Sequence, residues 1–141
     1  MLKIIKTDSR AVTPTRAYPS DIGYDLTAID IFKILSDKTI IYETGIAVQP
    51  PLGYYIEIVP RSSITKTKYL LANSIGIIDP SYNGSLKIAV RKIDDSLPDF
   101  ELPFCKFQII MRKAEYFDIQ EVNSLDESIR GDGAFGSTDL Q

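Results

Sequence analysis

The segment Pro60-Arg61-Ser62-Ser63 combines a guanidinium group with two hydroxyl groups, directly after an apolar stretch. A guanidinium fork can donate two parallel hydrogen bonds to phosphate oxygens, and serine hydroxyls on a turn add further donors. The segment could therefore hold a phosphate group at the end of a strand. A strand terminus without a ligand can carry the same residues, so this alternative remains.

Two other features could also bind phosphate. Near the end of the chain, Arg130 is followed by a glycine-rich run that includes Gly136, Ser137 and Thr138. Glycine lets backbone N–H groups approach an anion closely, and the two hydroxyls add donors. Gln108 is the other candidate, because strand alternation places its amide on the face opposite its apolar neighbours. A frayed terminus and a solvated glutamine are the alternatives.

Acid–base chemistry could come from the segment GIIDPSYNG at residues 76–84. Asp79 follows two isoleucines there and precedes a proline turn that contains Tyr82. A carboxylate at the mouth of an apolar strand is partly desolvated, which makes it a stronger base than an exposed one. Asp25 stands in a similar position in the segment DIGYDL. Each aspartate could instead be a turn-capping side chain.

The composition restricts the chemistry further. The chain of 141 residues has no histidine and one cysteine, which excludes an internal disulfide, a zinc site of cysteine and histidine, and every mechanism that uses histidine as an acid or a base. Any general base is therefore a carboxylate, a lysine or a tyrosine. The lone thiol, Cys105, lies between Phe104 and Lys106 and is typical of an inert, partly buried side chain.

Charge and hydropathy exclude two classes of partner. The net charge is -3, whereas a protein that binds polynucleotides normally presents a basic face. The N-terminal segment is interrupted by Lys3 and Lys6, and no later apolar run is long enough to span a bilayer. We therefore expect an intracellular protein that binds neither polynucleotides nor membranes.

The elements that must position the candidate residues are short strands. Apolar and polar residues alternate at residues 54–59 and 86–92, where Leu86, Ile88 and Val90 share one face. Similar short runs, rich in β-branched or aromatic residues, occur at residues 2–6, 39–42, 45–48 and 106–112. The sequence contains no long amphipathic helix. The pattern predicts a single all-β domain, either a barrel or a sandwich, and the alternation is lost from residue 118 onward.

The candidate segments stand in the order of the five motifs of the trimeric deoxyuridine triphosphatases, the dUTPases, and the chain resembles that family over almost its whole length. The matching segments are GYDL at 23–26, PRSS at 60–63, GIIDPSYNG at 76–84, KFQII at 106–110 and RGDGAFGST at 130–138. The third and fifth segments are the most specific. Five motifs in the family's order are hard to explain by chance.

The resemblance implies a single-domain, jelly-roll-like β-barrel over residues 1–117 and a flexible C-terminal arm over residues 118–141. It also implies a homotrimer with three active sites at subunit interfaces. The expected reaction is the hydrolysis of dUTP to dUMP and pyrophosphate, with Mg²⁺ as the cofactor. In the family this reaction limits uracil incorporation into DNA and supplies dUMP for dTMP synthesis.

The resemblance also implies roles for individual residues. Asp79 would orient and deprotonate the water that attacks the α-phosphorus, Tyr82 would pack against the deoxyribose, and Asn73 would lie near uracil. Asp25 would contact the water shell of the metal ion. The remaining substrate-binding residues would be Arg61, Ser62, Ser63, Gln108, Arg130, Gly136, Ser137 and Thr138, together with Phe135 over uracil.

The sequence departs from the family pattern at several positions. Ser63 and Ala134 replace glycines, and Ser81 replaces an acidic residue or a glycine. The fourth motif has FCKF at residues 104–107 in place of the usual glycine, acid, base and aliphatic residue. None of these departures removes a proposed catalytic group.

Two other functions remain open on the sequence. The related dCTP deaminases share the pattern of PRSS followed by IDPSYNG, but a glutamate would be expected on the strand after Gly84, and SLKIAVRK contains none. The glycine-rich tail also favours hydrolysis. The second alternative is a catalytically silent relative that binds a nucleotide or a protein partner. The presence of Asp79, Tyr82 and Phe135 argues against it.

Overall fold

Short strands make up nearly all of the regular structure in the computed structural model, which describes residues 1–139. In chain order the elements are β1 (Lys3–Lys6), β2 (Tyr24–Ala28), β3 (Asp30–Ile34), β4 (Thr39–Glu43), β5 (Ile46–Gln49), β6 (Tyr54–Pro60), the 3-10 helix η1 (Ser62–Lys66), β7 (Tyr69–Leu71), β8 (Gly76–Ile78), β9 (Lys87–Lys92) and β10 (Phe104–Lys113). None of the helical structure in residues 1–139 has the length or apolar character of a membrane-crossing helix.

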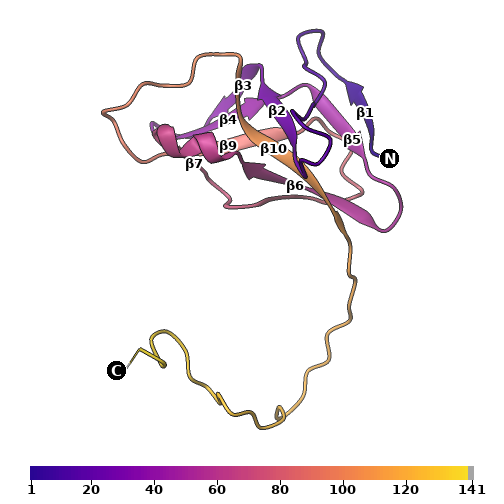
Figure 1. The fold of residues 1–141 in the computed structure, drawn as a ribbon, viewed down its shortest axis with the longest axis vertical. Helices are drawn as coiled ribbons and strands as arrows, with labels where there is room; N and C mark the ends of the chain where they lie inside the picture. The colour runs from indigo at the N-terminus through magenta and orange to yellow at the C-terminus, as the bar shows by residue number, and fades with distance from the viewer. Residues whose placement is uncertain (140–141) are drawn as a thin grey trace.

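The strands form two four-stranded sheets and one two-stranded sheet (Figure 1). The first four-stranded sheet has the order β2-β10-β6-β8, the second has the order β3-β4-β9-β7, and β1 pairs with β5. Because β10 lies between β2 and β6, three segments that are distant in the sequence become neighbours. This antiparallel arrangement is the all-β, jelly-roll-like architecture that the sequence predicts.

Every segment expected to be extended contains a strand, but the sequence analysis does not predict β2, whose pairing with β10 defines it, or the strands β3 and β7. Four of the five residues of β3 are exposed, so no alternation of buried and exposed positions marks this strand. β7 has only three residues, which is too short for a pattern of period two to be recognised. Both strands are defined by their pairing with β4 and β9 rather than by local sequence.

The core contains side chains from both four-stranded sheets. Leu86, Ile88 and Val90 are fully buried, as the alternation at the start of β9 predicts. Phe107 and Ile109 of β10 belong to the same cluster. Burial of each such side chain stabilises the fold by about 1.5–3 kcal/mol, so this cluster fixes the position of β10 against the second sheet.

Ionic and aromatic contacts hold the acidic loop between β9 and β10. The Asp99 carboxylate lies 2.7 Å from Lys68 Nζ and accepts a hydrogen bond of 2.7 Å from the Tyr69 hydroxyl. These hydrogen bonds, first from Lys68 and then from Tyr69, lower the pKa of Asp99. Phe100 stacks on Tyr69 and on Phe104, with ring centroids 4.5 and 4.0 Å apart. The loop therefore enters β10 at a fixed position.

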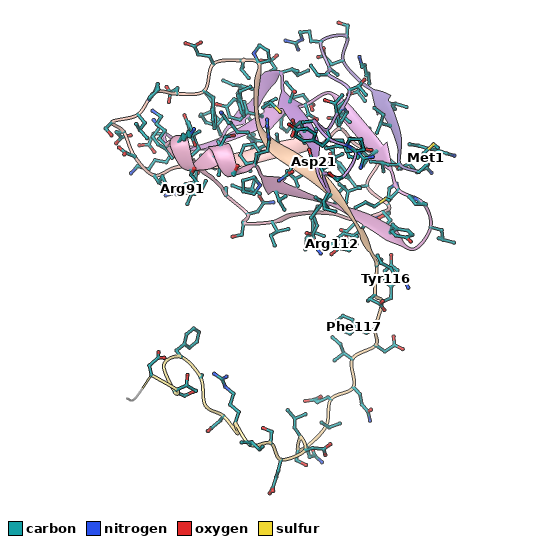
Figure 2. The ribbon with its side chains drawn as sticks, viewed as in Figure 1. Met1, Asp21, Arg91, Arg112, Tyr116 and Phe117 are labelled. Atoms are coloured by element: carbon teal, nitrogen blue, oxygen red, sulfur yellow. The ribbon has the colours of Figure 1, made fainter. Side chains whose placement is uncertain are left out.

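Beyond β10 the chain leaves the sheets. The Ala114 N–H donates to the carbonyl of Gly53 at 2.8 Å, and residues 115–139 contain no helix or strand. Figure 1 shows this segment running away from the sheets. In Figure 2 the side chains of Tyr116 and Phe117 stand clear of the sheets, and they are 80% and 81% exposed. Residues 140–141, the end of the expected arm, lie outside the described residues.

Candidate active site

The register of the first sheet brings together three residues that the sequence analysis proposes as phosphate or metal contacts. Gln108 on β10 pairs with Asp25 on β2 and with Val59 on β6, and Arg61 follows the last residue of β6. Asp25, Arg61 and Gln108 line a pocket of about 300 Å³, which we call the arginine pocket. Its other lining residues are Ala17, Asp21, Ile22, Gly23 and Ser62.

Contacts within the chain hold the guanidinium group of Arg61. Its Nε lies 3.1 Å from Asp25 Oδ1, and its Nη1 donates to the carbonyl of Cys105 at 3.0 Å. The Cys105 thiol lies 3.5 Å from the same Nη1, and this side chain is partly buried, as the sequence predicts. The Arg61 and Asp25 side chains are 38% and 32% exposed, so the pair adds little stability. Its main effect is to orient the guanidinium group.

Gln108 is oriented by the neighbouring strand. Its Nε2 donates to the carbonyl of Pro60 at 3.1 Å, while Phe107 and Ile109 are buried on the opposite face. The approach of this amide to β2 requires a glycine, because a Cβ atom at Gly23 would overlap the Gln108 side chain. The GYDL segment therefore contributes free space as well as the Asp25 carboxylate.

The two serines after Arg61 differ in their access to the arginine pocket. Ser62 is exposed and lines the pocket at the start of η1. Ser63 Oγ is buried and has no hydrogen-bond partner within residues 1–139. In this conformation a ligand in the pocket meets the Ser62 hydroxyl but cannot reach the Ser63 hydroxyl.

Asp79 and Tyr82 belong to a tight turn that follows β8. The Tyr82 N–H donates to the carbonyl of Asp79 at 3.0 Å and closes a turn that has Pro80 at its second position, where its fixed φ is favourable. The Tyr82 hydroxyl donates to the carbonyl of Ser85 at 2.8 Å. Residue 84 must be glycine for this contact, because a Cβ atom at Gly84 would overlap the Tyr82 phenol.

This turn forms one wall of a second pocket, of about 240 Å³, which we call the aspartate pocket. The pocket is lined by Ile77, Ile78, Asp79, Tyr82 and Lys87. Asp79 is exposed in the single chain, so the desolvation expected from the preceding strand is not supplied by this chain alone. Asn73 lies in the exposed turn between β7 and β8, before the strand that leads to Asp79.

The two pockets lie at opposite ends of β6. Ile78 pairs with Ile56, so Asp79 lies at the level of Tyr55, whereas Arg61 follows the other end of the strand. Arg61 stands six positions after Tyr55 along the extended chain, which corresponds to about 20 Å at the usual rise of a strand. An arginine side chain does not span that distance, so one copy of the chain does not bring Asp79 to the Arg61 guanidinium group.

The structure does not bring the C-terminal candidate residues to either pocket (Figure 1). Arg130 Nε donates to the carbonyl of Gly133 at 2.7 Å, and the Ser137 N–H donates to the carbonyl of Ala134 at 2.7 Å. Gly136 has a φ of 75°, whereas Ala134 is not among the described residues with positive φ. The exposed candidates in this segment are Arg130, Phe135, Gly136, Ser137 and Thr138.

Comparison with known proteins identifies the family. A family model for dUTPases matches residues 9–139. This chain belongs to the dUTPase family. It is 36% identical over 138 residues to the deoxyuridine 5'-triphosphate nucleotidohydrolase of Arabidopsis thaliana, with 96% of this chain and 81% of that protein covered. It is 34% identical over 139 residues to the protein of the same name from Corynebacterium glutamicum, with 97% of this chain and 93% of that protein covered.

Solved structures agree with the fold of this dUTPase. A variant of the Staphylococcus bacteriophage 80alpha dUTPase, solved with dUpNHpp, has a TM-score of 0.78 at 20% identity, with 98% of each chain covered. A dUTPase variant from phage phi11 of S. aureus, whose structure shows the coordination of a structural Mg(II) ion, has a TM-score of 0.73 at 18% identity. That match covers 90% of this chain and 99% of the phage chain. The likeness confirms the jelly-roll-like β fold.

The carboxylates of this dUTPase do not form a cation cage. No group of three or more histidine, cysteine, aspartate or glutamate side chains gathers at one point in residues 1–139. The arginine pocket contains two carboxylates, those of Asp21 and Asp25, and Asp25 is paired with Arg61. A hard cation that takes most of its ligands from phosphate oxygens and water fits such a donor set, whereas a cation that needs six protein oxygens does not.

Sequence reasoning missed one residue that holds Arg61 in place and one that lines the aspartate pocket of this dUTPase. The expectation for Cys105 concerns its thiol, whereas the contact with Arg61 is made by its backbone carbonyl, which accepts a hydrogen bond. The alternation at residues 86–92 indicates only that Lys87 lies on the face opposite Leu86 and Ile88, yet Lys87 lines the aspartate pocket. Its position three residues after Gly84 was the available signal, because a residue so close to a tight turn must lie near that turn.

Proposed function

We propose that this dUTPase hydrolyses dUTP to dUMP and pyrophosphate. Curated relatives that are 36% and 34% identical carry the name deoxyuridine 5'-triphosphate nucleotidohydrolase. The observation that carries the proposal is the arginine pocket, where a guanidinium group, an amide and two carboxylates converge in a chain that also retains Asp79 and Tyr82. This set of groups suits a triphosphate that binds with a cation.

In the proposed reaction, the Asp79 carboxylate holds a water molecule in line with the α-phosphorus and accepts one of its protons. The water oxygen forms a bond to the α-phosphorus, and the bond from this phosphorus to the bridging oxygen breaks. The electron pair leaves with pyrophosphate, and the other product is dUMP. Such a displacement requires placement of the water and neutralisation of the phosphate charge rather than a histidine.

The arginine pocket supports the role of phosphate binding. Arg61, Ser62 and Gln108 supply donors for phosphate oxygens, and hydrogen bonds fix the orientation of Arg61 and Gln108 before the ligand arrives. Ser63 Oγ is buried, so the Ser63 hydroxyl contributes no phosphate contact in this conformation. A bound Mg²⁺ would neutralise charge on the triphosphate, with Asp25 as a contact to its water shell.

We propose that the active form is a homotrimer with sites between subunits. The separation of about 20 Å along β6 supports this arrangement, because a second copy is needed to bring Asp79 to an arginine pocket. Exposed apolar side chains in the segment after β10, such as Tyr116 and Phe117, also favour contact with other copies. The contact between Asp79 and a second copy would also exclude water from the Asp79 carboxylate.

The proposed site of one nucleotide also includes the segment after β10. Residues 118–141 would form an arm that closes over the ligand, with Phe135 over uracil. The phosphates would then contact Arg130, Gly136, Ser137 and Thr138. Two glycines of this segment, Gly131 and Gly136, have a positive φ. They support this role because they let the backbone turn tightly around an anion. Asn73 would contact the edge of uracil.

A substrate panel tests the proposed activity. The purified chain is incubated with dUTP, dTTP, dCTP or UTP, with and without Mg²⁺, and both pyrophosphate and ammonia are measured. We expect pyrophosphate from dUTP, dependent on Mg²⁺, and little product from the other nucleotides. Ammonia from dCTP would support a deaminase, and the absence of turnover with all four nucleotides would support a silent relative.

A mixing experiment tests the position of the site between subunits. At dUTP concentrations far below KM, Asp79→Asn and Arg61→Ala chains each lose activity through a different pocket. The two variants are unfolded together, refolded as a mixture and assayed at such a concentration. If a site takes Asp79 from one chain and Arg61 from another, mixed assemblies contain some complete sites and regain activity. A mixture that stays as inactive as its components contradicts a site shared between chains.

A further inference from the structure

Lys87, the first residue of β9, makes an unusual set of contacts at the edge of the aspartate pocket. Its Nζ lies 3.2 Å from Ser85 Oγ and donates to the Ser85 carbonyl at 3.3 Å. Its side chain is only 27% exposed, and the ammonium group lies 4.6 Å from the centroid of the Phe32 ring. A lysine that serves only solubility would extend into solvent instead.

Glu43 completes the surroundings of this ammonium group. Glu43 and Lys87 are direct partners in the ladder between β4 and β9, and Glu43 Oε1 lies 3.8 Å from Lys87 Nζ. The same Oε1 accepts a hydrogen bond of 2.7 Å from the Ser85 hydroxyl. Its other oxygen, Oε2, accepts from the backbone N–H groups of Thr44 and Gly45 at 2.8 and 3.0 Å. Hydrogen bonds therefore hold both oxygens of the Glu43 carboxylate, and this carboxylate in turn holds the Ser85 side chain in place.

Ser85 connects this cluster to Tyr82. The Ser85 carbonyl accepts hydrogen bonds both from the Tyr82 hydroxyl, at 2.8 Å, and from Lys87 Nζ. A carbonyl oxygen has two lone pairs, so it can accept both donors. The contacts of Lys87 and Glu43 with Ser85 therefore determine where the acceptor of the Tyr82 hydroxyl lies.

We infer that Lys87 is a positioning residue that, with Glu43 and Ser85, holds the Tyr82 phenol rigidly against the sugar of the nucleotide. The inference rests on the proposed function, in which Tyr82 packs against the deoxyribose. Because the Tyr82 hydroxyl is engaged with Ser85, the ring excludes a 2'-hydroxyl by its shape rather than by a hydrogen bond. A Tyr82 ring that could move aside would leave room for a 2'-hydroxyl. Because Lys87 helps to restrain this ring, it contributes to the discrimination between dUTP and UTP.

The test compares two substitutions of Lys87. Lys87→Met retains most of the apolar stem but removes the charge and the donors, whereas Lys87→Arg retains both. The ratio of kcat/KM for dUTP to that for UTP is measured for each variant. We expect Lys87→Met to lower this ratio about 3- to 10-fold, the value of one or two weak hydrogen bonds. Lys87→Arg should retain most of the ratio.

Lys92→Met is the matched control. Lys92 lies on the same strand at the end distant from Tyr82, its side chain is 22% exposed, and its Nζ also lies 3.8 Å from a carboxylate oxygen, that of Asp95. The ratio should be unchanged in this variant. An unchanged ratio in Lys87→Met, or an equal fall in Lys92→Met, overturns the inference.

A double substitution separates a role through Tyr82 from a direct role of Lys87. Tyr82→Phe removes the hydroxyl that donates to Ser85. If Lys87 acts through this contact, Lys87→Met added to Tyr82→Phe lowers the ratio little further. Independent effects that multiply in the double variant contradict the inference.

Two further variants cover the remaining outcomes. If Lys87→Met unfolds below the assay temperature, Ser85→Ala is measured instead. This variant removes the link to Glu43 but retains the lysine, and it should lower the ratio in the same way. An unchanged ratio there also overturns the inference.

Tyr82→Ala tests the proposed function itself. If Tyr82→Ala lowers the ratio but Lys87→Met does not, only the positioning role is wrong. If Tyr82→Ala has no effect, Tyr82 does not contact the sugar.

Discussion

The arginine pocket and the aspartate pocket are built in different ways. The arginine pocket takes its residues from three distant segments, and its guanidinium group is already paired with Asp25 and the Cys105 carbonyl. The lining of the aspartate pocket comes from one continuous segment, residues 77–87, and Asp79 is exposed. The groups of the arginine pocket are therefore held in place within one chain, whereas the carboxylate of the aspartate pocket is open to water in one chain.

Substitution of Asp79 should produce the largest effect. Asp79→Asn preserves the shape of the turn but removes the base, so kcat should fall by about 10²- to 10⁴-fold. The dissociation constant of a non-hydrolysable dUTP analogue should change little, because the arginine pocket is intact. Turnover and analogue binding are measured on the same preparation. Unchanged turnover would exclude Asp79 as the base.

Substitution of Arg61 should affect binding at the other pocket. Arg61→Ala removes charge-assisted donors to phosphate, so KM for dUTP should rise by about 10- to 100-fold. Arg91→Ala is the control, because Arg91 is an exposed residue of β9 whose Nη1 donates to Thr39 Oγ1 at 3.0 Å (Figure 2). Steady-state kinetics should show no change in KM for the control. An equal rise in both variants would indicate a general effect of charge rather than the pocket.

Truncation after Arg130 tests whether the two pockets are sufficient for full activity without the glycine-rich segment. Residues 131–139 contain no core side chain, so the melting temperature should change by less than about 2 °C. The value of kcat/KM for dUTP should fall by about 10-fold, because the proposed closure over the ligand is lost. Calorimetry and kinetics on the truncated chain test both statements. A large fall in melting temperature would mean that the segment stabilises the fold instead.

Glu57 lies on β6 between the two pockets and should influence stability more than catalysis. Its side chain is buried, and burial alone would raise its pKa, but hydrogen bonds from Tyr55 and Arg112 outweigh burial and hold the pKa of Glu57 below its usual value. A lowered pKa in the folded state stabilises the fold at neutral pH, and this contribution is lost as the pH falls through the folded-state pKa.

Glu57→Gln should therefore lower the melting temperature at pH 7 by about 3–6 °C. Between pH 7 and pH 3 the variant should lose less stability than the natural chain, because the linked proton uptake is removed. Thermal unfolding at a series of pH values measures both effects. Glu101→Gln, at an exposed position, is the control and should shift the melting temperature by less than about 1 °C. Equal pH dependence in the natural chain and Glu57→Gln would contradict the assignment.

The difference between the pockets also explains what could be predicted from the sequence. The order Asp79, Pro80, Tyr82, Gly84 is local, and the turn that it forms depends on residues that are neighbours in the chain. The alternation of Leu86, Ile88 and Val90 is likewise a local signal, and all three side chains are buried. The fold class and this part of the site could therefore be predicted.

Contacts across the sheets could not be predicted in the same way. The pairing of Asp25 with Arg61 depends on the register of β2, β10 and β6, which no single segment encodes. Lys87 stands at a polar position in the alternation of residues 86–92, and the sequence shows this. Its contact with Glu43, however, requires the pairing of β4 with β9. The separation of the two pockets along β6 also appears only when the strands are placed side by side.

In the proposed assembly, the placement of the two pockets at opposite ends of β6 would link activity to protein abundance. A solitary subunit would hold two incomplete halves of a site, so turnover would follow the fraction of chains that are assembled. By mass action, dilution below the dissociation constant of the assembly would reduce activity more steeply than it reduces the amount of protein. The cell could then adjust nucleotide hydrolysis through expression level alone, without an effector molecule.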